Sequence, residues 1–118
     1  MNTVDIRHSQ VEGGVPVLDV AGVLDAHNYE QLEQTFDSYF DRGVFTLIVE
    51  IPRLEYISSA GAGVFIGAAG KAQANDGNIV VVAPRENVQE IFDLLGICHV
   101  FPVVESREKA LRIFAAAR

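Results

Sequence analysis

Residues 45–63 read FTLIVEIPRLEYISSAGAG, and this stretch decides the class of fold. Its first part, residues 45–51, is apolar on both faces except for Thr46 and Glu50. This pattern is typical of a central strand that is covered on both sides, as in a parallel sheet. Pro52 then ends the strand. The stretch therefore predicts a sheet with helices packed on it.

The second part of the stretch starts a helix that is unusually rich in alanine and glycine. We expect this helix to run from about Ser59 to Ala74, so that Ser58 and Ser59 lie at its N-terminus. The first turn of a helix has unpaired N–H groups and carries partial positive charge. A serine at this place can cap the helix, or it can carry a phosphate that the helix end tolerates. The residues alone leave both roles open.

The flanking sequence predicts further strand and helix units. A hairpin over residues 4–21 comes first, and residues 22–25 are expected to connect it to a helix. The remaining predicted elements are helices at 26–42, 86–95 and 105–117 and strands at 79–83 and 100–104. The predicted order is ββαβαβαβα, which gives an α/β fold: a mixed β-sheet with a parallel core and packed α-helices. We expect one domain over residues 1–118.

Composition and charge narrow the class of protein. The 118 residues are 49% hydrophobic and 21% charged, which is typical of an ordinary folded domain. The net charge is -7 and the lysines and arginines are scattered, which argues against nucleic acid as a direct partner. The start of the chain has no signal-peptide pattern, and the low-charge stretch at 57–70 is too short to span a bilayer. We therefore expect a cytoplasmic protein without membrane insertion, and a monomer.

The usual residues of enzyme and metal sites form no recognisable pattern. The three histidines, His8, His27 and His99, lie in separate predicted elements with no metal or triad spacing. Neither serine of the pair stands in the Gly-x-Ser-x-Gly motif of hydrolases. The single cysteine, Cys98, lies in an apolar run and is expected to be a buried core residue. We therefore expect no enzyme activity, no metal and no cofactor.

Several segments together resemble the signature of anti-sigma factor antagonists, the single-domain STAS family. Residues 54–64, LEYISSAGAGV, match the segment in which an aromatic and an aliphatic residue precede the phosphorylated serine. Residues 20–25, VAGVLD, look like the Gly-x-Leu-Asp that follows the second early strand of that family. Residues 77–82 and 88–97 match its third segment. The resemblance extends over nearly the whole chain, and its motifs are specific when taken together.

The resemblance implies a phosphorylation switch at the helix start. In this family a serine/threonine kinase that is also the anti-sigma factor binds the surface and phosphorylates the serine. The unphosphorylated protein sequesters the kinase and frees the sigma factor, and a PP2C-type phosphatase resets the cycle. By position the acceptor is Ser59. Ser58 stands where many members have aspartate, so it remains the alternative acceptor.

The resemblance also implies a partner-binding surface around the acceptor. The expected contact residues are Asp25, His27, Ser58, Ala60, Gly61 and Ala62. Ala62 stands where a larger aliphatic residue is common, which is expected to make the surface shallower. Taken from the residues alone, Asp25 can equally cap the helix that starts near Ala26, and His27 can be a solvated residue of its first turn.

A second hypothesis assigns the chain to a different class of STAS protein. The chain is then a STAS subunit of a signalling scaffold or of a lipid-transport complex, and its surface serves constant protein contact without phospho-switching.

A phosphate adds about -1.5 to -2 charges and three acceptor oxygens, so under the first hypothesis it changes binding and leaves the fold intact.

Overall fold

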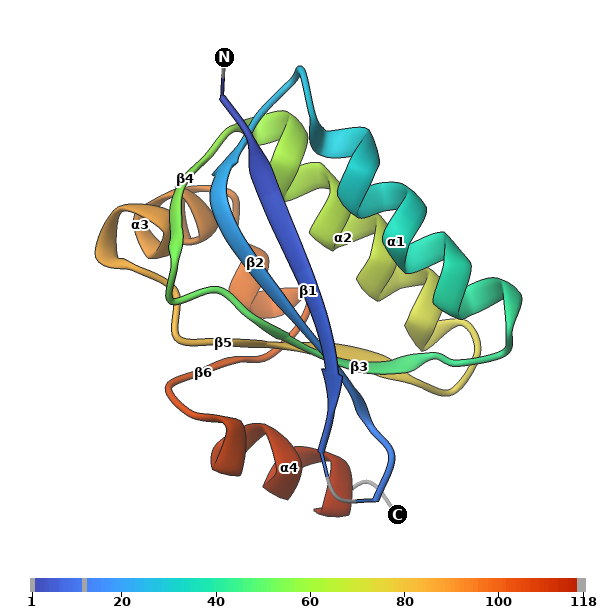
Figure 1. Cartoon of the computed structure of the whole chain (residues 1–118). Helices are drawn as coiled ribbons and strands as arrows, with labels where there is room; N and C mark the ends of the chain where they lie inside the picture. Colours follow the sequence, from blue (N-terminus) through green and yellow to red (C-terminus); the bar gives the residue numbers. More distant parts are fainter. Residues whose placement is uncertain (1, 12, 117–118) are drawn as a thin grey trace.

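Six strands of the described chain form one mixed sheet, and helices cover both of its faces (Figure 1). The computed structural model describes residues 2–11 and 13–116. The strands are β1 (Val4–Gln10), β2 (Pro16–Leu24), β3 (Thr46–Glu50), β4 (Leu54–Ile57), β5 (Asn78–Val82) and β6 (Val103–Val104). They follow one another across the sheet in the order β1-β2-β3-β5-β6, while β4 pairs with β2 away from this path.

Strand β2 has partners on both sides and divides one of its sides between two strands. β1 runs antiparallel to β2, whereas β3 pairs in parallel with its first half and β4 pairs in parallel with its end. The β4 pairing places Leu24 beside Ile57. The register shifts directly after Gly22, which has a φ of 93° and stands where an added Cβ would lie 2.5 Å from the carbonyl oxygen of Thr3. Glycine is therefore required at this bend.

The two faces of the sheet carry different helices. Alternate residues of β3 show this division, because Leu47 and Val49 lie in one core and Ile48 lies in the other. Strand β3 is thus buried on both faces, as its sequence predicts. In the described chain three helices pack on the first face and one on the second, namely α1 (Tyr29–Asp41), α2 (Ser59–Gln73) and α3 (Glu86–Leu94), and then α4 (Arg107–Ala116).

Helix α2 is held in place by an aromatic cluster. The ring of Phe65 lies 6.2 Å from that of Phe36 on α1, 5.8 Å from that of Phe92 on α3 and 6.2 Å from that of Phe101. All of these distances between ring centres are in the range of favourable aromatic pairs. The cluster fixes α2 against both neighbouring helices and therefore fixes the position of its N-terminus.

The predicted mixed sheet with a parallel core is confirmed, while several element bounds differ. β2 continues to Leu24, so the expectation that residues 22–25 form a connector is wrong. The sequence does not predict β4. Only its first and last residues are buried, so buried and exposed side chains do not alternate along it as they do in a typical strand. Helix α1 begins at Tyr29 rather than near Ala26, since a hydrogen-bonded turn precedes it.

The segment after α3 differs most from its prediction. A short 3-10 helix, η1 (Ile97–His99), takes up the start of the apolar run, and β6 begins only at Val103. Ile97 is buried and Cys98 is exposed, because the tight turn points successive side chains in different directions. The expectation of a buried cysteine is therefore wrong. None of the helices in the described residues has the length and hydropathy needed to cross a bilayer.

Candidate functional site

The serine pair lies where β4 ends and α2 begins. Ser58 has an extended backbone, and its Oγ accepts a hydrogen bond of 3.2 Å from the N–H of Gly61. Its carbonyl oxygen accepts the N–H of Ala62 at 2.9 Å, and its own N–H donates to the carbonyl of Leu24 at 2.9 Å. Ser58 is thus the N-cap of α2. The capping role that the sequence left open between the two serines belongs to Ser58.

Ser59 is the first residue of α2, and its side chain is exposed. Among the described residues, no side chain or backbone group forms a hydrogen bond with its hydroxyl, which therefore faces solvent. The first turn of α2 carries no acidic residue. A phosphate on Ser59 would lie at the positive end of the helix dipole, close to N–H groups that lack a partner within the helix.

A close contact between α2 and β2 sets the position of this helix start. Gly61 is buried, and a Cβ added there would lie 2.9 Å from Cγ of Leu24 and 3.0 Å from Cγ1 of Ile57. Any larger residue would force Leu24 or Ile57 to shift, so glycine lets the first turn rest on the end of β2. Ala62 is also fully buried. In the isolated chain both residues are buried and serve helix packing.

Asp25 follows β2 and lies in a turn that its own carboxylate helps to hold. Its Oδ1 accepts the N–H of His27 at 2.9 Å, and its Oδ2 accepts the side-chain amide of Asn2 at 3.2 Å. The buried Asn28 closes the turn by accepting the N–H of Asp25 and donating to the carbonyl of Val23. The hydrogen bond from His27, followed by that from Asn2, lowers the pKa of Asp25 below its ordinary value of 3.8. A negative charge is therefore fixed here.

The alternative in which Asp25 caps α1 is wrong. The residue at the N-cap position is Asn28, and its side chain makes no capping bond. The backbone carbonyl of Asp25 accepts the N–H of Tyr29, while its carboxylate stays within the turn. His27 is exposed in this turn and lies before the helix rather than in its first turn.

The structure brings residues 20–25 and residues 54–64, the two segments predicted to form the site, together at one end of the sheet (Figure 1). The link is the pairing of the ends of β2 and β4, together with the hydrogen bond from the N–H of Ser58 to Leu24. The exposed His27 and Ser59 and the half-buried Ala60 stand on this edge with Asp25. These residues form the candidate site.

Two side chains at this edge were missed from the sequence. Tyr56 of β4 is 48% exposed and lies two residues before the cap. Asn87 of α3 donates to the carbonyl of Glu55 at 2.7 Å and so covers the free edge of β4. The available signal for Tyr56 was the polar–aromatic pair inside LEYI, but without a predicted strand it gave no direction for the side chain.

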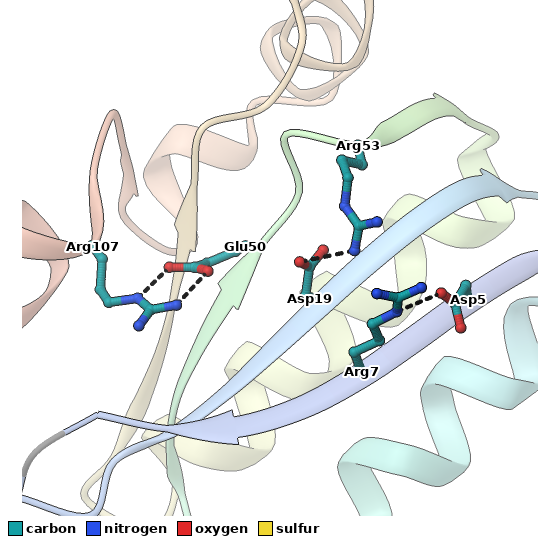
Figure 2. A network of polar contacts seen from close by, with 6 residues as sticks. All are labelled: Asp5, Arg7, Asp19, Glu50, Arg53 and Arg107. Carbon is teal, nitrogen blue, oxygen red and sulfur yellow. Dashed lines mark hydrogen bonds and ion pairs between the residues drawn. The ribbon is translucent and has the colours of Figure 1, made fainter.

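A network of ion pairs supports the site from the other face of the sheet (Figure 2). Arg107 of α4 donates from Nε and Nη2 to the two carboxylate oxygens of Glu50, at 2.6 and 2.8 Å, and this pairing raises the pKa of Arg107. Arg53 binds Asp19 at 3.0 Å, and its carbonyl accepts the N–H of Gly22. These contacts hold α4 to β3 and fasten the link between β3 and β4. They position the strand that leads to the serines.

Metal chemistry has no donor set in the described part of the chain. No three histidine, cysteine, aspartate or glutamate side chains of these residues are placed to hold one ion. The arrangement at the edge instead offers an exposed hydroxyl, a fixed carboxylate and a helix N-terminus. This combination suits modification and protein contact.

The sequence as a whole identifies the family. Residues 8–110 match the STAS domain profile. The chain belongs to the STAS domain family. BtrV of Bordetella bronchiseptica, named as an anti-sigma factor antagonist, is 34% identical over 104 residues, which cover 88% of this chain and 90% of BtrV. The anti-sigma-B factor antagonist of Staphylococcus epidermidis is 27% identical over 89 residues, or 75% of this chain and 82% of that protein.

Solved STAS structures share the fold. The anti-sigma factor antagonist SpoIIAA in its unphosphorylated form superposes with a TM-score of 0.80 at 22% identity, covering 95% of this chain and 97% of that one. The phosphorylated form of the Bacillus cell fate determinant SpoIIAA gives 0.69 at 20% identity, covering 93% and 99%. The predicted family and fold are thus confirmed. The names of the bacterial sequence relatives support anti-sigma factor antagonism as the function of the chain.

Proposed function

We propose that this STAS protein binds an anti-sigma factor with serine kinase activity when it is unphosphorylated, and thereby releases a sigma factor. Phosphorylation of Ser59 ends this binding, and a PP2C-type phosphatase restores it. The observation that carries the proposal is that the two neighbouring serines have different structural roles. Ser58 is engaged by the N–H of Gly61, whereas the hydroxyl of Ser59 is exposed and without a partner among the described residues.

A phosphate on Ser59 changes the contact surface without changing the fold. The capping bond of Ser58 stays in place, because the modified oxygen belongs to the next residue. The phosphate adds about -1.5 to -2 charges at a helix end that favours them. It also adds bulk beside Asp25, His27, Ser58 and Ala60, the residues we propose for partner contact. The proposal takes the chain as one STAS domain that acts as a monomer in the cytoplasm.

Phosphate mapping tests the proposal directly. The purified chain is incubated with ATP and each serine kinase of the anti-sigma factor class from the same genome, and the products are digested and analysed by mass spectrometry. We expect one phosphate on Ser59, its loss in Ser59→Ala, and its removal by a PP2C-type phosphatase. Ser58→Ala is the matched control and keeps the modification. A phosphate on Ser58 contradicts the assignment of the acceptor to Ser59. A chain that stays unmodified with every kinase contradicts the proposal and favours a STAS subunit without switching.

A further inference from the structure

Helices α1 and α2 border a groove that the proposed switch leaves unused. The groove has a volume of about 230 Å³, and its apolar floor comes from Phe36 and Phe40 of α1 and Val64 and Ala68 of α2. Its α2 rim contains Gly63 and Gly67, which stand one helical turn apart. In Figure 1 the two helices run side by side from the end of the molecule that carries the site.

The fold itself gives no reason for these two glycines. A Cβ added at Gly63 or at Gly67 would meet no atom within 4 Å, in contrast to Gly61, where it would collide with Leu24. Glycine in a helix interior is destabilising relative to alanine, so open space alone does not favour it. What the pair provides is a low rim over which the backbone of another molecule can approach the floor.

The charges around the groove are mostly negative. Acidic side chains recur along the exposed side of α1 at spacings of three and four residues, at Glu30, Glu33, Asp37 and Asp41. The groove's lysine, Lys71, lies with its ammonium 3.8 Å from Asp37 and 5.6 Å from the ring of Phe40. Among the described residues, no cation pairs with the other three acids. The groove thus combines an apolar floor with a wall in which Lys71 pairs with Asp37, while Glu33 has no ion-pair partner among the described residues.

We propose that this groove binds an amphipathic helix of the partner protein. Its apolar stripe would lie on the floor, its backbone would pass over the two glycines, and a lysine or arginine would face Glu33. The groove begins about 6 Å along α2 from Ser59, so one partner can contact both. The identity of the partner rests on the proposed function, whereas the chemistry of the occupant follows from the groove.

A defined probe tests the groove without knowledge of the natural partner. A short helical peptide of leucine and lysine, amphipathic by design, is titrated into the isotope-labelled chain and followed by amide chemical shifts. We expect the shifts to gather on α1 and α2 around the groove. A matched peptide with glutamate in place of lysine should bind at least about tenfold more weakly, because it faces like charges.

Paired variants distinguish binding in the groove from nonspecific attraction between the acidic protein and the basic peptide. Glu33→Lys with Asp37→Lys should weaken peptide binding about tenfold, whereas Glu86→Lys with Glu90→Lys on α3, the same change in net charge at the same spacing, should leave it unchanged. Gly67→Leu fills the groove and should abolish binding. Gly70→Leu lies on the same helix outside the groove and should keep it.

Three outcomes would overturn the inference. The first is a set of shifts centred on α3, with binding lost in the α3 variant. The second is an equal loss in both charge variants. The third is self-association through α1 and α2, seen by sedimentation without peptide, which would make a second copy of the chain the occupant.

The kinase provides an independent arm of the test. A kinase that phosphorylates Ser59 should bind Gly67→Leu about tenfold more weakly than Gly70→Leu. If the peptide occupies the groove but no kinase modifies Ser59, the groove inference stands and the proposed function fails. If a kinase modifies Ser59 and binds both glycine variants equally, the proposed function stands and the groove inference fails.

Discussion

The starts of α1 and α2 lie at the same end of the sheet, yet they are built differently. The start of α1 holds negative charge already, because Asp25 is fixed in the preceding turn and Glu30 lies in the first turn. The start of α2 has a neutral cap, Ser58, and no acid in its first turn. Two helix ends with the same positive dipole therefore differ in whether a negative group is present. The end without one is the end that carries the exposed hydroxyl of Ser59.

The largest expected effect comes from moving the start of α2. Gly61→Val places a branched side chain against Leu24 and Ile57, where even a Cβ lies within 3.0 Å of side-chain atoms. Such overpacking should lower the free energy of unfolding by about 1–3 kcal/mol. Urea denaturation measures this change. Gly63→Ala, two residues along, should instead keep or raise stability, since no atom lies within 4 Å of its added Cβ. Equal effects of the two variants would show that Gly61 does not fix the helix start.

The next effect comes from adding a negative group to the first turn of α2, which has none. Ser59→Asp adds a carboxylate to the first turn of α2, which should raise the free energy of unfolding by about 0.3–1 kcal/mol. The same variant should weaken binding to the kinase that modifies Ser59 by about tenfold or more. Calorimetry of the complex and denaturation of the free chain measure the two effects. Ser59→Asn, similar in shape but neutral, is the control and should leave stability nearly unchanged. A Ser59→Asp chain that binds as well as the original would contradict the switch.

A third change removes the cap of α2 and leaves Ser59, the proposed acceptor, in place. Ser58→Ala loses the hydrogen bond to the N–H of Gly61 and should lower the free energy of unfolding by about 1 kcal/mol. Ser58→Asp should restore most of this loss, because aspartate is an equally good cap. Denaturant titration of both variants, with phosphorylation of Ser59 measured alongside, tests the separation of roles. Loss of phosphorylation in a folded Ser58→Asp chain would argue against it.

The smallest effect concerns the charge already present before α1. The pKa of Asp25 is lowered in the folded chain, so its ionised form stabilises the fold at pH values above the unfolded pKa. This contribution is lost as the pH falls through the folded pKa, below 3.8. Asp25→Asn should therefore be less stable than the original chain at neutral pH, and the difference should vanish in acid. Denaturation across this pH range measures it. Asn2→Ala should change stability in the same direction, and a difference that persists in acid would contradict the assignment.

Local pattern was enough to predict one of the two helix starts. The apolar run of β3 and the small residues after Ser59 predict a buried strand and a helix, because period and composition are local properties. Those signals located the serine pair at the start of α2. They did not divide the roles of the two serines, since the capping geometry of Ser58 depends on the exact residue at which the helix begins.

The start of α1 could not be predicted in the same way. The contact of Asp25 with Asn2 joins residues far apart in the sequence, and the turn closed by Asn28 has no simple periodicity. The packing of Gly61 on Leu24 is likewise a contact between distant segments. The short β4 lacked alternation, which hid both the exposure of Tyr56 and the continuation of β2. The features that could not be predicted from the sequence therefore depend mainly on tertiary contacts.

The bend at Gly22 has a consequence for when Ser59, the proposed acceptor, can be recognised. The two halves of the site come from the ends of β2 and β4, which pair with a register shift directly after this glycine. In an unfolded or newly made chain, Ser59 is an ordinary serine in a flexible segment, far from Asp25. A kinase that contacts both segments therefore distinguishes the folded protein from the unfolded chain. The chemical mark on Ser59 would then report the completion of folding as well as the state of the signal.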